Sequence, residues 1–118
     1  MKNETLETLL NRRSCRSFDG RKVDRETLDK ILEAGTYAPS GMGRQSAIMI
    51  AIDDPETVRA LSALNAKIMG REGDPFYGAK TVIVVLADKN VPTYLYDGSL
   101  GMGNLRNAAE ALGVNSCW

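Results

Sequence analysis

The stretch "AIMIAIDDPETV" at residues 47–58 holds the clearest structural signal in the chain. Residues 47–52 are apolar at every position, which is typical of a strand that is buried on both faces. Asp54 and Pro55 then mark a helix start, because an aspartate caps free N–H groups and the fixed φ of proline suits the first helical position. A doubly apolar strand that leads into a helix predicts a sheet enclosed between helices.

The segments on either side continue this alternation. The run "TVIVVLA" at 81–87 predicts a second buried strand, and residues 114–118 begin a further extended piece. Four side chains are placed to cap the start of a helix: Asn3, Asp24, Asp54 and Asp97. In the same order, the helices are expected to end near residues 11–13, before Pro39, near residue 69 and at residue 112. The order predicts an α+β fold, a three-layer α-β-α sandwich with a mixed central sheet.

Length and composition are those of one ordinary globular domain over residues 1–118. Fifteen basic and fifteen acidic residues cancel, which argues against a nucleic-acid-binding surface. No apolar run approaches the roughly 20 residues of a membrane span, and the opening "MKNETLETLL" does not resemble an export signal. We therefore expect a cytoplasmic protein with neither nucleic-acid nor membrane partners.

The absence of histidine limits the chemistry. Without it, Ser/His/Asp and Cys/His catalysis and the common zinc sites are excluded, and we expect no metal. Cys15 and Cys117 form no Cys-x-x-Cys pair, so two free thiols in a reducing compartment are favoured over a redox dithiol or a disulfide.

Two short motifs offer binding chemistry. In "RRSCRSF" at 12–18, guanidinium forks and a serine hydroxyl suit a phosphate, although arginines at the end of a helix can simply complement its dipole. The connection "APSGMGRQSA" at 38–47 is richer than a helix-to-strand link needs, with small residues that permit close approach. The glycines of "GSLGMG" at 98–103 do not match the dinucleotide fingerprint and favour close helix packing instead.

Taken together in order and spacing, these motifs resemble the nitroreductase family of flavoproteins. The resemblance rests on Arg-Arg-Ser-x-Arg at 12–16 and on Ala-Pro-Ser-Gly-x-x-Arg-Gln at 38–45. It continues through "DPFYGAKTVIVVLAD" at 74–88 and "DGSLGMGNLRNAAEALGVNSCW" at 97–118. It implies an FMN-dependent oxidoreductase that passes electrons from NADH or NADPH to nitroaromatic, quinone or similar small-molecule acceptors by a ping-pong mechanism. It also implies a homodimer with FMN at the interface.

The resemblance also implies roles for individual residues. Arg12, Ser14 and Arg16 would hold the FMN phosphate and ribityl chain, while Arg13 and Cys15 would contribute mainly backbone. The flavin ring would be lined by Pro39, Ser40 and Gly41, often from the partner subunit, and contacted by Gln45 and Asn65. No catalytic side chain is implied, because the flavin performs the chemistry. Gly43 and Ser46 stand where many relatives carry Asn and Pro, which puts one ring-side hydrogen bond in doubt.

Members of the family continue beyond the point that corresponds to Trp118, where a new strand begins in this chain. We therefore expect a single nitroreductase-like FMN-binding domain that is truncated at its C-terminus. The alternative to an enzyme is a non-enzymatic flavin-fold module that only dimerises or binds FMN weakly.

Overall fold

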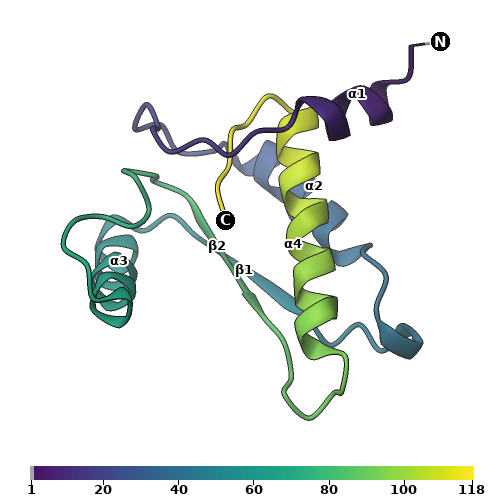
Figure 1. The fold of residues 1–118 in the computed structure, drawn as a ribbon. Helices are drawn as coiled ribbons and strands as arrows, with labels where there is room; N and C mark the ends of the chain where they lie inside the picture. Colours follow the sequence, from purple (N-terminus) through teal and green to yellow (C-terminus); the bar gives the residue numbers. More distant parts are fainter. Residues whose placement is uncertain (1) are drawn as a thin grey trace.

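The computed structural model describes residues 2–118 and follows the expected alternation of helices and strands (Figure 1). In chain order the elements are α1 (Glu4–Asn11), α2 (Arg25–Thr36), the short 3-10 turn η1 (Gly41–Gly43), β1 (Ile48–Ile52), α3 (Pro55–Met69), β2 (Val82–Leu86) and α4 (Tyr94–Ala111). Both strands and the first three helices lie within about a residue or two of the predicted bounds, a difference typical of element ends.

Three of the four predicted helix caps are confirmed. The side chains of Asn3, Asp24 and Asp54 each accept a hydrogen bond from the backbone N–H three residues later, at 3.1, 3.0 and 3.0 Å. The fourth prediction is wrong, because α4 begins at Tyr94 and Asp97 lies inside its first turn. The Asp97 carboxylate is buried and accepts hydrogen bonds from the Gly41 N–H and from the hydroxyl of Thr93, so it does not cap a helix N–H.

The strands pair antiparallel and lie between two helical layers. Met49 is opposite Val85 and Ile52 is opposite Val82. Within residues 2–118, parallel pairing is limited to an isolated bridge between Ser14 and Ser116. In Figure 1, α3 lies on one side of the strands and α2 and α4 lie on the other. The α+β class and the expected order of layers are therefore confirmed.

The core lies between one face of this sheet and the helices α2 and α4. Ile31 and Leu105 are almost completely buried there, and Met49 and Val85 pack against them. A Cβ atom on Gly101 would come within 2.7 Å of Met49 Cε, so the missing side chain lets α4 approach β1 closely. The prediction that the glycines of 98–103 serve helix packing is confirmed at this position.

The opposite face of the sheet is more open than expected. The strands are apolar at every position, which predicts burial on both faces, yet Ile48 and Ile50 of β1 are 55% and 41% exposed. Leu86 of β2 is opposite Ile48 and is exposed as well. The expected burial on both faces is thus wrong for these described residues, because α3 leaves that face partly uncovered.

Candidate functional site

The segment 12–16 lies beside the C-terminal part of α4. The backbone N–H of Cys15 donates to the carbonyl of Ser116 at 3.0 Å, which places the segment against residues that follow the helix. From α4 itself, Arg106 Nη2 donates to Ser14 Oγ at 2.9 Å and Arg106 Nε lies 3.4 Å from Ser116 Oγ. The fold therefore adds a further arginine to the one cluster of cations that the sequence singles out.

No ion pair with a carboxylate involves this cluster among the residues that the structure describes. The ion pairs there involve Arg21, Arg25 and Lys30, and none involves Arg12, Arg16 or Arg106. Burial and the neighbouring charge of Arg12 lower the pKa of Arg106, Cys117 acts in the opposite direction, and Arg16 lowers the pKa further. Arg12 Nη1 is buried and has no hydrogen-bond partner. An anion that binds here would relieve the repulsion among the arginines.

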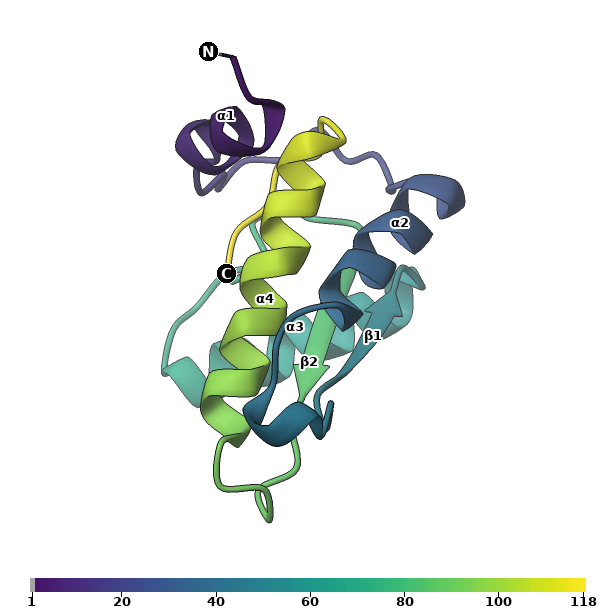
Figure 2. The ribbon, with the colours of Figure 1, turned by 90° about the vertical axis from the view of Figure 1, so that its right-hand side faces the viewer.

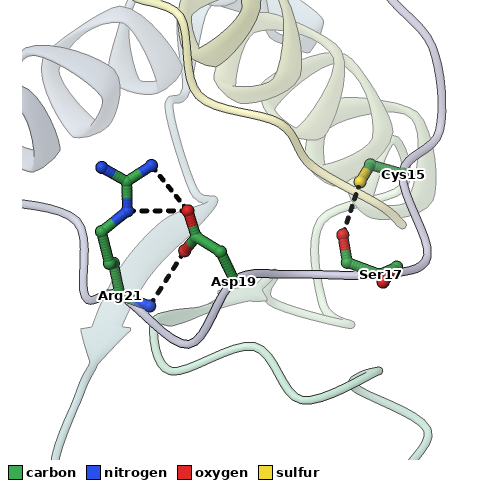
Figure 3. Close-up of polar contacts among 4 residues, drawn as sticks. All are labelled: Cys15, Ser17, Asp19 and Arg21. Carbon is green, nitrogen blue, oxygen red and sulfur yellow. Dashed lines mark hydrogen bonds and ion pairs between the residues drawn. The ribbon is translucent and has the colours of Figure 1, made fainter.

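Two nearby arginines are engaged in other contacts. Arg13 Nη1 donates to the carbonyls of Leu10 and Arg12 at 2.7 and 2.9 Å, so its side chain contacts the end of α1, as the alternative interpretation of the motif predicts. Arg21 pairs with Asp19 through its side chain and its backbone N–H (Figure 3). This pairing lowers the pKa of Asp19.

Cys15 and Cys117 are both free thiols. The Cys15 thiol donates to the carbonyl of Ser17 at 3.1 Å, which Figure 3 also shows. Its side chain thus supports the local loop, and its backbone N–H holds the segment 12–16 to Ser116.

The loop at 38–45 is anchored to the N-terminal end of α4. Asp97 accepts from the backbone N–H of Gly41 at 2.9 Å and from the hydroxyl of Thr93 at 2.8 Å. A Cβ atom on Gly41 would come within 2.7 Å of Thr93 Cγ2. The absence of a side chain at Gly41 therefore lets the backbone of the loop pack closely against Thr93. Ser40 Oγ accepts from the backbone N–H of Gln45 at 2.9 Å.

The same loop contains unusual backbone. Met42 and Gln45 have φ values of 57° and 50°, a left-handed conformation that residues other than glycine rarely adopt. Such conformations persist only where the surroundings enforce them, and they are frequent at binding sites. The hydrogen bonds to Asp97 and Ser40 supply that enforcement.

A small cavity lies between this loop, the end of α2 and α4. Its volume is about 170 Å³, and its lining includes Pro39, Ser40, Gln45 and Asp97. Pockets for small organic ligands usually have about 300–1,000 Å³. The cavity that the single chain forms at this loop is therefore smaller than such pockets. Ser46 Oγ, next to Gln45, is buried and has no hydrogen-bond partner.

One chain does not gather all the predicted site residues. The segment 12–16 and the loop 38–45 lie toward opposite ends of α4, as both ribbon views show (Figures 1 and 2). Arg106 and Asp97, which contact them, are separated by about 14 Å along the helix axis. Asn65 is exposed on α3, on the other side of the strands.

Sequence analysis missed two residues of these arrangements. Arg106 contacts Ser14, which is 92 positions away, so no local pattern connects them. Asp97 was assigned to a helix cap, and only its burial identifies it as the link to Gly41. An arginine within the small and apolar residues of "NLRNAAEAL" is the one signal that could have directed attention to position 106.

The described residues, 2–118, contain no group of three or more His, Cys, Asp or Glu side chains placed to hold a metal ion. In the same part of the chain, none of the helices has the length and apolar character that crossing a bilayer requires.

Comparisons with known proteins agree with the fold and the motifs. The model of the nitroreductase family matches residues 9–77. An Archaeoglobus fulgidus protein with the provisional name NADH dehydrogenase/NAD(P)H nitroreductase is 32% identical over 98% of this chain and 66% of its own. An FMN reductase (NADPH) of Bacillus subtilis is 27% identical over 98% of this chain and 53% of its own.

A solved structure shows the same likeness in three dimensions. The crystal structure of a Bacteroides fragilis nitroreductase with bound FMN superposes with a TM-score of 0.90 at 29% identity, over 99% of this chain and 70% of that one. The chain spans about half to two thirds of the length of the two curated relatives described above.

Proposed function

Because the chain belongs to the nitroreductase family, we propose that it is the FMN-binding part of an NAD(P)H-dependent oxidoreductase. The observation that carries this proposal is the cluster of Arg12, Arg16 and Arg106, none of which forms an ion pair within residues 2–118. In this proposal residues 1–118 belong to one domain and work in the cytoplasm, where free thiols such as Cys15 and Cys117 stay reduced.

The residues present fit a phosphate group. Guanidinium groups match phosphate oxygens in geometry and charge, and the unpartnered Nη1 of Arg12 is a donor that a phosphate oxygen would satisfy. Arg12, Ser14 and Arg16 would hold the phosphate and ribityl chain of FMN, and the backbone at Arg13 and Cys15 would shape the turn around it. The side chain of Arg13 takes no part, because it is bonded to the end of α1.

The loop at 38–45 would serve the flavin ring. Ser40 already accepts a hydrogen bond from Gln45 N–H, so its own hydroxyl proton remains free for a ligand. Pro39, Gly41 and the Gln45 amide would line the ring, and Asn65 would contact its polar edge from α3.

Bound FMN would supply the redox chemistry, accepting two electrons from NADH or NADPH and passing them to a quinone, nitroaromatic or similar acceptor in a ping-pong cycle. The protein would then need no histidine and no side-chain nucleophile. Its residues would bind the cofactor, orient it and limit the access of water.

We propose further that the working unit is a homodimer in which the loop 38–45 of one chain completes the site of the other. Two observations support this. The cavity at that loop is smaller than a usual ligand pocket, and the loop lies away from the segment 12–16 of the same chain.

The proposal is tested by titrating the purified chain with FMN and by following flavin-dependent oxidation of NADH or NADPH with a quinone acceptor. Arg16→Ala should weaken FMN binding by about 1.5–3 kcal/mol, the usual contribution of a charge-assisted hydrogen bond. Arg21→Ala is the matched control, because it removes the same charge from a residue that is paired with Asp19. If the two variants titrate alike, the arginines of the segment 12–16 do not form the phosphate site.

One alternative is favoured by the small size of the cavity at the loop 38–45. It is a non-enzymatic module that dimerises or binds FMN weakly and performs no turnover. The alternative would be supported if the protein binds FMN but oxidises neither NADH nor NADPH in the presence of an acceptor.

A further inference from the structure

We propose that Arg106 is a positioning residue of the anion site, which orients the hydroxyl of Ser14 toward a bound phosphate and adds a charge to those of Arg12 and Arg16. The anion that we propose for this site is the phosphate of FMN, so the inference rests on the proposed function. Sequence analysis did not assign Arg106 a role.

The hydrogen bond between Arg106 and Ser14 fixes the direction of the serine hydroxyl. Arginine has donors and no acceptor, so the contact of 2.9 Å between Arg106 Nη2 and Ser14 Oγ uses the serine oxygen as acceptor. The hydroxyl proton of Ser14 must then point elsewhere, and it has no acceptor among the residues of the described chain. Ser14 thereby keeps one O–H donor for an oxygen atom of a ligand.

Three features of the fold hold Arg106 in this place: the buried neighbours of Arg106 on α4 and its contacts with Ser14 and Ser116. Its neighbour Leu105 and also Ala109 are buried in the core, which sets the rotation of α4 about its axis. Its guanidinium contacts Ser14 and lies 3.4 Å from Ser116, and these two serines form the isolated parallel bridge. One side chain therefore joins α4 to both extended segments.

A purely structural link between two serines would not need a positive charge. At this position burial and the charges of Arg12 and Arg16 oppose the charge of Arg106 and lower its pKa, although Cys117 acts in the opposite direction. A phosphate dianion would reverse the sign of this interaction, as a ligand does when it adds the missing counter-charge. The buried Nη1 of Arg12, a residue of the same cluster, also lacks a hydrogen-bond partner, as expected if an anion is the missing group.

The test compares FMN with riboflavin, which lacks only the phosphate. Arg106→Gln retains hydrogen-bond donors without the charge, and it should weaken FMN binding about ten- to hundredfold while changing riboflavin binding less than about twofold. Arg106→Lys retains the charge without the planar fork, and it should recover only part of the loss. Arg21→Gln, an equal change of charge outside the cluster, should leave both affinities unchanged.

Coupling between the two residues provides the second measurement. In a Ser14→Ala background, Arg106→Gln should cost clearly less FMN affinity than it does in the parent, because the positioning contribution is already lost. Full recovery by Arg106→Lys, or equal losses with and without Ser14, would overturn the positioning role. Equal losses for FMN and riboflavin would also overturn it, because they indicate general damage to the fold.

Inorganic phosphate separates this inference from the proposed function. At constant ionic strength, phosphate should raise the Tm of the parent and of Arg21→Gln, and raise that of Arg106→Gln much less. Trp118, the one tryptophan of the sequence, lies two residues from Ser116 and offers a fluorescence signal for the same titration. If no flavin binds but phosphate still acts through Arg106, the proposed function fails and the anion site stands. If phosphate stabilises all three proteins equally, the anion site fails.

Discussion

At the scale of single residues, Asp97 joins two parts of the chain that are far apart in sequence. It is 4% exposed, and its two carboxylate oxygens accept from the Gly41 N–H and the Thr93 hydroxyl. These bonds hold the loop that carries Ser40 against the first turn of α4. The position of the cavity wall therefore depends on one buried side chain.

Asp97→Ala should lower the free energy of unfolding by about 1–3 kcal/mol, because it leaves the partly buried Gly41 N–H without a partner. Asp97→Asn should cost less, since the amide can accept from Gly41 and donate to the Thr93 oxygen. Urea denaturation measures both, with exposed Asp53→Ala as the control. Equal losses for Ala and Asn would show that the charge matters and the hydrogen bonds do not.

Gly41→Ala should destabilise the chain by about 1–3 kcal/mol, because the new Cβ atom overlaps with Thr93. In a Thr93→Ala background the cost should be smaller, as expected for two residues in direct contact. Gly103→Ala in α4 is the matched control. Its Cβ atom meets no other group within 4 Å, so this variant should stabilise the helix by about 0.5–1 kcal/mol. Additive costs for Gly41 and Thr93 would contradict the overlap.

At the scale of elements, α3 is specified mainly by local signals. Asp54 caps it, Pro55 begins it, and Gly70 ends it with a φ of 65°. Val58 and Ala66 are buried, whereas Leu64 and Ile68 on the same helix are largely exposed. With so little tertiary packing, the terminal signals carry an unusual share of the helix's stability.

The stabilisation by the Asp54 cap should depend on pH. The side-chain and backbone hydrogen bonds from Thr57 lower the pKa of Asp54 below its ordinary value of 3.8. A carboxyl whose pKa is lowered by folding stabilises the native state above that ordinary value, and the stabilisation is lost as the pH falls through the depressed pKa. Asp54→Ala should therefore lower Tm at pH 7, and its difference from the parent should shrink below about pH 4. Asp53→Ala should show no such difference, and a gap that persists in acid would contradict the assignment of the cap.

At the scale of the whole molecule, apolar side chains remain exposed on several elements. Leu10 of α1, Ile48 of β1 and Ile68 of α3 are 73%, 55% and 83% exposed. Such side chains would be covered where chains associate, as in the proposed homodimer, in which each site draws on both chains.

Subunit complementation tests that sharing directly. A heterodimer of an Arg16→Ala chain with a Gly41→Ala chain should bind one FMN tightly, because the intact arginine of one chain meets the intact loop of the other. A heterodimer of the parent with the double variant should bind none tightly. Differently tagged chains allow both species to be isolated and titrated. The reverse pattern would place each site within a single chain.

Much of the secondary structure and the family could be predicted from the sequence. The caps at Asn3, Asp24 and Asp54 form within one helical turn, so nearby residues suffice to specify them. The positions of the strands are equally local, because their apolar composition predicts a strand, although it predicted burial on a face that is partly exposed. The motifs at 12–16 and 38–45 identified the family before any contact was known.

Contacts across long stretches of chain were decided only by the tertiary structure. The sequence determined where both strands and the helices α1, α2 and α3 begin, since these starts depend on neighbours within a few residues, but it misplaced the start of α4. It did not indicate that Asp97 would accept from Gly41, or that Arg106 would reach Ser14, because those pairs lie 56 and 92 positions apart. A charged side chain finds its partner only after the backbone has packed, and desolvation then sets the strength of the interaction.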